Sequence, residues 1–155
     1  MGNSFAISMR KRITNLRDIV RLFNLLKAEI FYKKSVLKEA CKNASLRCIY
    51  PYNAWLNNIF MNMEEGKKSF YEIWEYELIF LYENSSLKTN DMDLIREMGQ
   101  ALGHYDKETQ KVNIDLELDE IHRKVLLLEN ELTNKMKIAY IGSFLAGLLI
   151  IISVV

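Results

Sequence analysis

The last eighteen residues of the chain, 138–155, contain no charged side chain, although 26% of all residues are charged. As a helix rising 1.5 Å per residue this stretch is about 27 Å long, close to the hydrocarbon thickness of a bilayer. Lys135 and Lys137 lie just before it, and no basic residue follows it. The sequence therefore predicts a transmembrane helix over 138–155, and the positive-inside rule places the preceding chain in the cytoplasm.

Small residues recur along this predicted helix at intervals of three to five positions. In lipid, small side chains let two helix backbones approach closely, which a helix that only anchors a domain does not require. The pattern favours packing on another transmembrane helix, and a plain anchor with incidental small residues is the alternative. The residues of this face are Ala139, Gly142, Ser143, Ala146 and Gly147.

The chain ahead of this tail has the composition of one helical domain. Only one proline and six glycines occur among 155 residues, so residues that break helices are scarce. A chain of this length holds one modest domain beside the membrane segment. We therefore expect an all-α protein, in which a cytoplasmic helical bundle over 10–134 continues through one long helix into the membrane.

Hydrophobic spacing and capping residues locate several helices within the bundle. Apolar residues three and four positions apart predict an amphipathic helix over 5–32. Ser35 and Asn90 are each predicted to cap the start of a following helix, and Gly103 to close one in the left-handed conformation. Asp106 is expected to begin a last helix of about fifty residues that runs to the C-terminus.

The first half of that last helix has apolar residues spaced four, three, four, three and four positions apart. This heptad spacing is typical of a helix face that packs against another helix. The first long helix has a matching stripe, so packing within the same bundle is favoured, and an intermolecular coiled coil stays open as the alternative. The residues of this seam are Ile114, Leu118, Ile121, Val125, Leu128 and Leu132.

Charge is distributed unevenly along the chain. Residues 1–47 contain eleven Lys and Arg but only three acidic residues, whereas the remainder is acidic. A basic segment beside an anionic membrane surface and pairing with the acidic later helices both account for this distribution. No extended patch of basic and aromatic residues is present, so we expect no nucleic-acid partner.

The sequence contains no recognisable catalytic motif. Asp119 with His122 is the nearest approach to the Glu-x-x-His units of a di-iron site, and His104 is expected in a turn. Cys41 and Cys48 have no second pair of ligands near them and are interpreted as reduced thiols. We therefore expect no enzyme activity, no cofactor, no metal and no small-molecule substrate.

Three segments resemble the stage III sporulation protein AB family. LKAEIFYKKSVL at 26–37 resembles the family's L-x-x-E-I-x-Y-x-x-T-P-L, LGHYDKETQ at 102–110 resembles L-G-x-x-D-x-x-x-Q, and FLAGL at 144–148 resembles the membrane tail. The order is the same, and the resemblance covers nearly the whole chain. The residues that carry the two cytoplasmic motifs are Glu29, Ile30, Tyr32, Leu37, Leu102, Gly103, Asp106 and Gln110.

The resemblance implies an integral-membrane assembly component of the channel-like complex that links mother cell and forespore during sporulation. The family is also similar to the cytoplasmic domains of the inner-membrane platform protein of type II secretion and type IV pilus systems. By that analogy the chain connects a cytoplasmic secretion-type ATPase, protein AA of the same operon, to other channel proteins, with a homo-oligomer as a further option. A generic C-terminally anchored helical adaptor, whose seam binds another helical protein, is the alternative.

The sequence departs from the family pattern in three places. Val36 stands where the family usually has proline, and Ser143 where a glycine is common. The family is also expected to begin with a transmembrane helix, which the uncharged residues 2–9 are too short to form. We therefore expect residues 1–9 to be the remnant of such a helix, because the start codon is placed too late or the gene has lost the helix. A restored helix would make the protein two-pass instead of single-pass.

Overall fold

The computed structural model describes residues 2–154, with side chains from Ser4 onward. Met1 and Val155, the outermost residues of the predicted N-terminal remnant and of the predicted transmembrane helix, lie outside the described residues. The described chain is all-α, as predicted. Its helices are α1 (Gly2–Phe31), α2 (Leu37–Ser45), α3 (Tyr52–Glu65), α4 (Phe70–Glu83), α5 (Thr89–Leu102) and α6 (Lys107–Val154).

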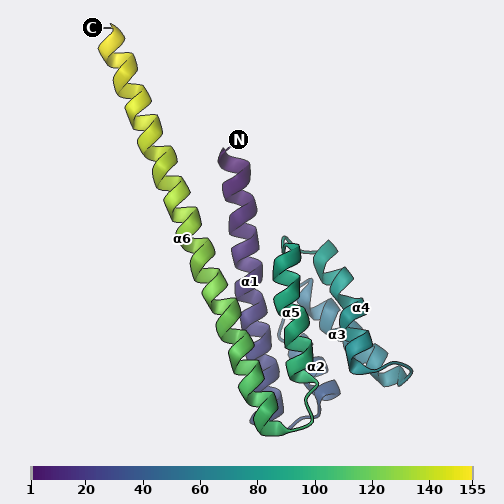
Figure 1. Cartoon of the computed structure of the whole chain (residues 1–155). Coiled ribbons are helices and arrows are strands. Elements are labelled where there is room, and N and C mark those ends of the chain that lie inside the picture. Colours follow the sequence, from purple (N-terminus) through teal and green to yellow (C-terminus); the bar gives the residue numbers. More distant parts are fainter. Residues whose placement is uncertain (1, 155) are drawn as a thin grey trace.

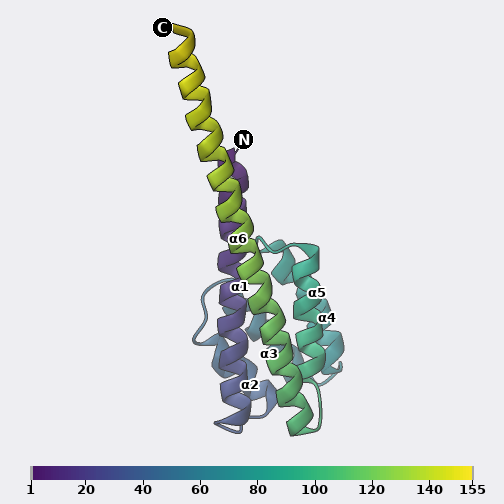
Figure 2. The same cartoon turned by 60° about the vertical axis from the view of Figure 1, so that its left-hand side comes forward.

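The two longest helices, α1 and α6, form an antiparallel pair, and the four short helices pack along one side of it (Figure 1). Helix α5 packs on α6, α4 on α5, α3 on α4, and α2 joins α3 to α1. Both views show the start of α1 and the end of α6 pointing the same way, with α6 extending far beyond the other helices (Figure 2). We call the opposite end of the bundle, where α1 ends and α6 begins, the distal end.

The predicted seam on α6 is the surface that packs into the bundle. Ile114, Leu118, Ile121, Val125 and Leu128 are buried, and Leu132 is half-buried. They face a stripe on α1 with the same three- and four-residue spacing, and α5 covers their other side. The prediction that the seam packs inside its own bundle is therefore confirmed. The buried residues of the α1 stripe are Met9, Ile13, Leu16, Ile19, Leu22, Phe23, Leu26 and Ile30.

Two tryptophans form the centre of the core beneath the short helices. Trp55 and Trp74 are fully buried, with ring centroids 4.8 Å apart. The indole Nε1 of Trp74 donates a hydrogen bond to the carbonyl of Ile95, at 2.9 Å. Gly99 packs against this ring so closely that a Cβ there would lie 2.3 Å from Trp74 Cδ1. The two tryptophans are thus core residues, because their rings fill the space between α3, α4 and α5.

The two predicted serine and asparagine caps are wrong, because tertiary partners bind both side chains. Helix α2 begins after Val36, which has no side-chain cap, and the Ser35 hydroxyl instead donates to Glu29. Helix α5 begins at Thr89, so Asn90 is already helical, and its Oδ1 accepts a hydrogen bond from Arg12.

Gly103 closes α5 but not in the predicted conformation. Its φ of −80° is right-handed, so the expected left-handed C-cap is wrong here. A Cβ at this position would lie 2.7 Å from the hydroxyl oxygen of Tyr71, so this exposed side chain would have to move to make room for it. A left-handed glycine C-cap occurs at Gly66, which ends α3 with a φ of +69°.

Candidate membrane anchor and interaction surfaces

The C-terminal part of α6 is long and apolar enough to cross a bilayer. An eighteen-residue window of this helix has a mean hydropathy of 2.0, and none of it is buried against the rest of the chain. Large apolar side chains such as Phe144, Leu149 and Ile152 are exposed all round the helix. A helix that is apolar on every face is stable in lipid and not in water, so the segment fits membrane anchoring.

The first turns of α1 lie beside the start of this apolar segment. Arg10 Nη2 approaches the sulfur of Met136, at 3.4 Å, and the ammonium of Lys135 lies 4.1 Å from the centre of the Phe5 ring. An apolar groove of about 810 Å³ separates the two helices there, and Ile7 and Ala139 contribute to its walls. The uncharged residues 2–9 and the first turns of the apolar segment are therefore at the same level.

The predicted small-residue face of α6 is open in this structure. A Cβ added to Gly142 or Gly147 would meet nothing within 4 Å. Ala139, Ser143 and Ala146 are exposed as well, and the first two line the groove beside α1. Among the described residues none packs against Gly142 or Gly147, so this part of the face is accessible to another helix.

The two family motifs of the bundle, which are more than sixty residues apart in sequence, meet at the distal end. The ends of α1 and α6 are in contact there, with the Lys107 ammonium 5.8 Å from the centre of the Phe31 ring. Ile30 and Leu102 are buried, and Leu37 is half-buried. Sequence spacing alone could not bring the two motifs together, because their proximity depends on the antiparallel pairing of α1 with α6.

Glu29 organises the first motif. Its buried carboxylate accepts hydrogen bonds from Lys33 at 3.0 Å, from Ser35 at 3.0 Å and from Asn43 at 3.1 Å. These contacts, the one from Lys33 foremost, outweigh burial and lower the pKa of Glu29 below its usual value. The hydrogen bond from Asn43 of α2 joins that helix to the end of α1, so the role of Glu29 in this fold is structural.

Asp106 and Gln110 organise the second motif. Asp106 Oδ2 accepts hydrogen bonds from the backbone nitrogen of Thr109, at 3.0 Å, and from its hydroxyl, at 2.5 Å. Asp106 thus caps α6, as the sequence suggests. The buried Gln110 donates to the carbonyl of Leu102 at 2.7 Å, which satisfies an open carbonyl at the end of α5.

Around these structural residues the distal end exposes apolar and aromatic side chains. Tyr32 is 83% exposed, Tyr105 is fully exposed, and Val36, in the connection between α1 and α2, is 65% exposed. We call Tyr32, Val36 and Tyr105 the distal surface. Tyrosines exposed in this way are typical of surfaces that bind another protein.

A second apolar surface was not predicted from the sequence. Tyr76, Ile79 and Tyr82 of α4 are exposed and line an open groove of about 740 Å³ beside Met92 and Arg96 of α5. Their spacing of three residues along α4 is the signal that could have found it, because it marks a second apolar stripe outside the core. The groove is a further candidate contact for a helix of another protein.

The residues considered for metal chemistry are scattered. Asp119, His122 and His104 are all exposed, and the described residues contain no group of three or more His, Cys, Asp or Glu that could hold a metal ion. Cys41 is buried, and burial raises its pKa to about 12, so it stays a neutral thiol. Cys41 and Cys48 are both free cysteines.

Comparison with known proteins agrees with these features. The model of the family described as Stage III sporulation protein AB matches residues 1–155. Stage III sporulation protein AB of Bacillus subtilis (strain 168) is 25% identical over 151 residues, which cover 97% of this chain and 88% of the relative. A solved structure of Stage III sporulation protein AB has the same fold, with a TM-score of 0.73 and 22% identity, over 79% of this chain and 97% of that one. The chain therefore belongs to the stage III sporulation protein AB family.

Proposed function

We propose that this protein is a membrane-anchored structural component of the sporulation channel complex between mother cell and forespore. In this proposal the bundle over 10–134 lies on the cytoplasmic, mother-cell side, and α6 fixes it to the membrane. Its task is to connect a cytoplasmic secretion-type ATPase to the membrane assembly. The observation that carries the proposal is the continuity of α6, whose first half is part of the bundle core and whose second half is bare and apolar.

The cytoplasmic placement is supported by the basic residues at the membrane boundary. Arg10, Lys11 and Arg12 follow the uncharged residues 2–9 of α1, and Lys135 and Lys137 precede the apolar segment of α6, so the basic residues of both helices lie on the bundle side. Lys and Arg beside a membrane segment are retained in the cytoplasm. The basic residues of α1 and those of α6 therefore both support a cytoplasmic bundle.

Contact with the ATPase is assigned in this proposal to the distal surface. This end is farthest from the apolar half of α6, so a cytoplasmic partner can reach it without approaching the membrane (Figure 1). Hydrogen bonds of Glu29 and Gln110, from the two family motifs, hold the chain in place at this end. Tyr32 and Tyr105 supply exposed aromatic area. Exposed aromatic residues on a well-ordered foundation make strong contacts at low entropic cost.

The generic adaptor that binds through its α6 seam is less well supported. The seam residues of α6 are occupied by α1 and α5, so an intermolecular coiled coil would first have to open the bundle. The small-residue face around Gly142 and Gly147 stays available for another channel protein or a second copy of this chain.

Copurification of the full-length protein with the ATPase in mild detergent tests this function. Replacing Tyr32 and Tyr105 together by alanine should abolish copurification while the thermal unfolding midpoint is unchanged, because both side chains are exposed. Tyr76→Ala with Tyr82→Ala, on the other apolar surface, is the matched control and should retain the ATPase. If only the control pair lost copurification of the ATPase, the contact would be assigned to α4. If the unaltered protein did not copurify with the ATPase, the coupling role would be contradicted.

The Asp106→Ala variant tests whether Asp106, at the distal end, contributes to the stability of the bundle or to binding of the ATPase. Loss of the cap should lower the unfolding midpoint modestly and leave copurification intact at low temperature. A stable variant that no longer copurifies would show that Asp106 itself contacts the partner.

A further inference from the structure

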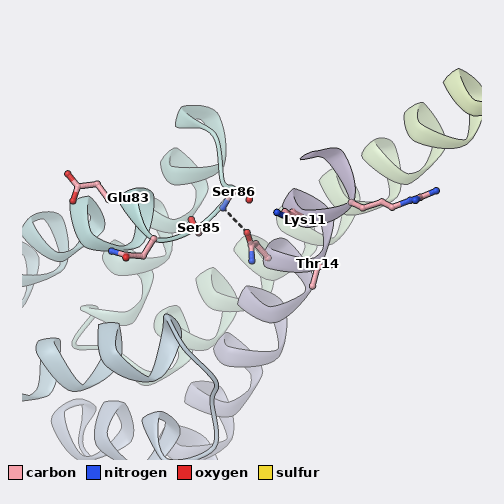
Figure 3. A pocket seen from close by; sticks show the side chains of 8 residues that line it. Lys11, Thr14, Glu83, Ser85 and Ser86 are labelled. Carbon is pink, nitrogen blue, oxygen red and sulfur yellow. Dashed lines mark hydrogen bonds between the residues drawn. The ribbon is translucent and has the colours of Figure 1, made fainter. Parts of the chain in front are cut away.

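A pocket at the membrane-facing end of the bundle is lined by basic and hydroxyl-bearing side chains (Figure 3). It lies between α1 and the connection from α4 to α5 and has a volume of about 550 Å³. Asn15 Oδ1 accepts a hydrogen bond from the backbone nitrogen of Ser86, at 2.8 Å, which fixes the connection to α1. The pocket therefore has walls from two elements that are held together.

Its depth coincides with the headgroup layer of a bilayer. Arg10 is at the level of Met136, two residues before the apolar segment begins at Ile138. Asn15, at the other side of the pocket, is five residues and so about 7.5 Å further from the membrane along α1. The polar layer on each side of a bilayer is about 5–8 Å thick, so Arg10 and Asn15 bracket it.

The pocket contains donors that the protein does not use. Among residues 4–154, the Lys11 ammonium and the hydroxyls of Thr14 and Ser86 make no hydrogen bond or ion pair with the chain. Arg12, the next cation on α1, is buried and bonded to Asp91, so it is not available. In the view of Figure 3 the Lys11 side chain extends from α1 towards the connection that carries Ser86, and the carboxylate of Glu83 points away from it. Lys11 and Ser86 line the same pocket from its two walls.

The charge of the lining fits a singly charged anion. Arg10 and Lys11 contribute two positive charges and Glu83 one negative charge. A phosphodiester carries one negative charge and offers acceptor oxygens to an ammonium and a hydroxyl together. The surface of the cytoplasmic leaflet supplies such groups at high local concentration.

We propose that this pocket binds the phosphodiester headgroup of an anionic phospholipid, with Lys11 and Ser86 as the direct donors. The bound headgroup then fixes the depth and the rotation of the bundle relative to the membrane. The C-terminal part of α6 alone does not fix them, because it is apolar on every face. The proposal rests on the membrane placement of α6 given above and is independent of the ATPase contact. Failure of ATPase copurification therefore leaves it untouched.

Native mass spectrometry of the full-length protein in detergent tests the site. Phosphatidylglycerol and phosphatidylcholine with identical acyl chains are added separately, and the dissociation constant of the first bound lipid is measured. We expect phosphatidylglycerol to bind about tenfold more tightly, since one charge-assisted hydrogen bond contributes about that factor. Lys11→Gln should remove this preference, and Ser86→Ala should weaken phosphatidylglycerol binding about threefold.

Lys137→Gln is the matched control, because it removes the same charge at the membrane boundary on α6, outside the pocket. It should change phosphatidylglycerol binding less than about twofold. Equal losses in Lys11→Gln and Lys137→Gln would overturn the proposal in favour of diffuse surface charge, as would equal binding of the two lipids. Displacement of the lipid by inorganic phosphate at similar concentration would likewise overturn it, in favour of a site for a soluble anion.

Discussion

Arg12 of α1 donates two hydrogen bonds to the carboxylate of Asp91 in α5, at 2.7 and 2.8 Å. Lys124 of α6 contacts the same carboxylate at 2.5 Å, and the backbone nitrogen of Lys88 donates to it at 2.8 Å. Burial of Asp91 raises its pKa, but these contacts outweigh burial and lower the pKa below the usual value. One buried carboxylate thus joins α1, α5 and α6.

Asp91→Ala should reduce the free energy of unfolding by about 3–5 kcal/mol, because it leaves Arg12 and Lys124 without their shared partner. Chemical denaturation of the full chain in detergent measures this. Asp93→Ala is the control two residues away, where an exposed pair with Arg96 should contribute less than about 1 kcal/mol. Equal effects of the two variants would show that Asp91 does not hold the helices together.

The stabilisation from Asp91 should disappear in acid. Its pKa is lower in the folded than in the unfolded state, so its contribution is complete above the unfolded value near 3.8. The contribution is lost as pH falls through the folded value. The difference in unfolding free energy between the unaltered protein and Asp91→Asn should therefore shrink as pH falls below about 4; a difference that is independent of pH would contradict this assignment.

Gly99→Ala should be far more costly than Gly103→Ala. At Gly99 the new Cβ meets the rigid, buried Trp74 ring at 2.3 Å, and overpacking of this kind costs about 1–3 kcal/mol. At Gly103 the obstacle is the hydroxyl end of Tyr71, whose exposed side chain can move aside. Thermal unfolding and near-ultraviolet circular dichroism of the tryptophans compare the two variants. The reverse order would mean that Tyr71 is the more firmly held side chain.

Glu117 should make the bundle less stable as pH rises towards neutrality. Burial, and secondly the charge of Glu97, raise its pKa to about 7. The folded state therefore retains a proton that the unfolded state releases from about pH 4.5 upward, so the free energy of unfolding falls with pH through this window. Because the carboxyl is partly exposed, the effect should stay below about 1 kcal/mol.

Glu117→Gln should remove this pH dependence, and Glu97→Gln should reduce it. Denaturation of the three proteins at intervals from pH 4.5 to pH 7 provides the measurement. Glu131→Gln, elsewhere on α6, is the control and should retain the slope of the unaltered protein. A stability gain in Glu117→Gln that is the same at every pH would exclude titration as its origin.

Gly142→Leu combined with Gly147→Leu should leave bundle stability unchanged, because neither position has a neighbour within 4 Å. The same change should prevent close packing on another transmembrane helix, since the backbones can no longer approach. Crosslinking in membranes through a cysteine introduced at Ser143 measures that packing. Crosslinks that persist at full yield would assign α6 the role of a plain anchor.

The sequence predicted those features that depend on local periodicity. The α6 seam from Ile114 to Leu132 and the Asp106 cap appear in the structure because hydrophobic spacing and a local hydrogen bond determine them. The caps at Ser35 and Asn90 were wrong because distant residues compete for their side chains. Helical spacing places Asp91, but not Asp93, on the apolar face of α5, whereas its partners Arg12 and Lys124 are distant in sequence and could not have been chosen before the fold was known.

The interaction surfaces were predictable only in part. Apolar exposure of the tail follows from composition, whereas the distal surface requires the antiparallel pairing that brings the end of α1 beside the start of α6. The lipid pocket depends on a loop hydrogen bond between Asn15 and Ser86, two residues separated by most of the bundle in sequence. Long-range proximity of this kind leaves no periodic signal along a single chain.

Helix α6 contains no proline, and its first glycine is Gly142, so no flexible joint separates its two halves. The part between residues 107 and 137 is about 45 Å long, and a tilt of about 10° in the membrane would displace its far end by about 8 Å. A force that a partner applies at that end would therefore change the tilt angle of α6 in the bilayer. The molecule would act as a lever, with its fulcrum at Lys135 and Lys137, beside the start of the apolar segment.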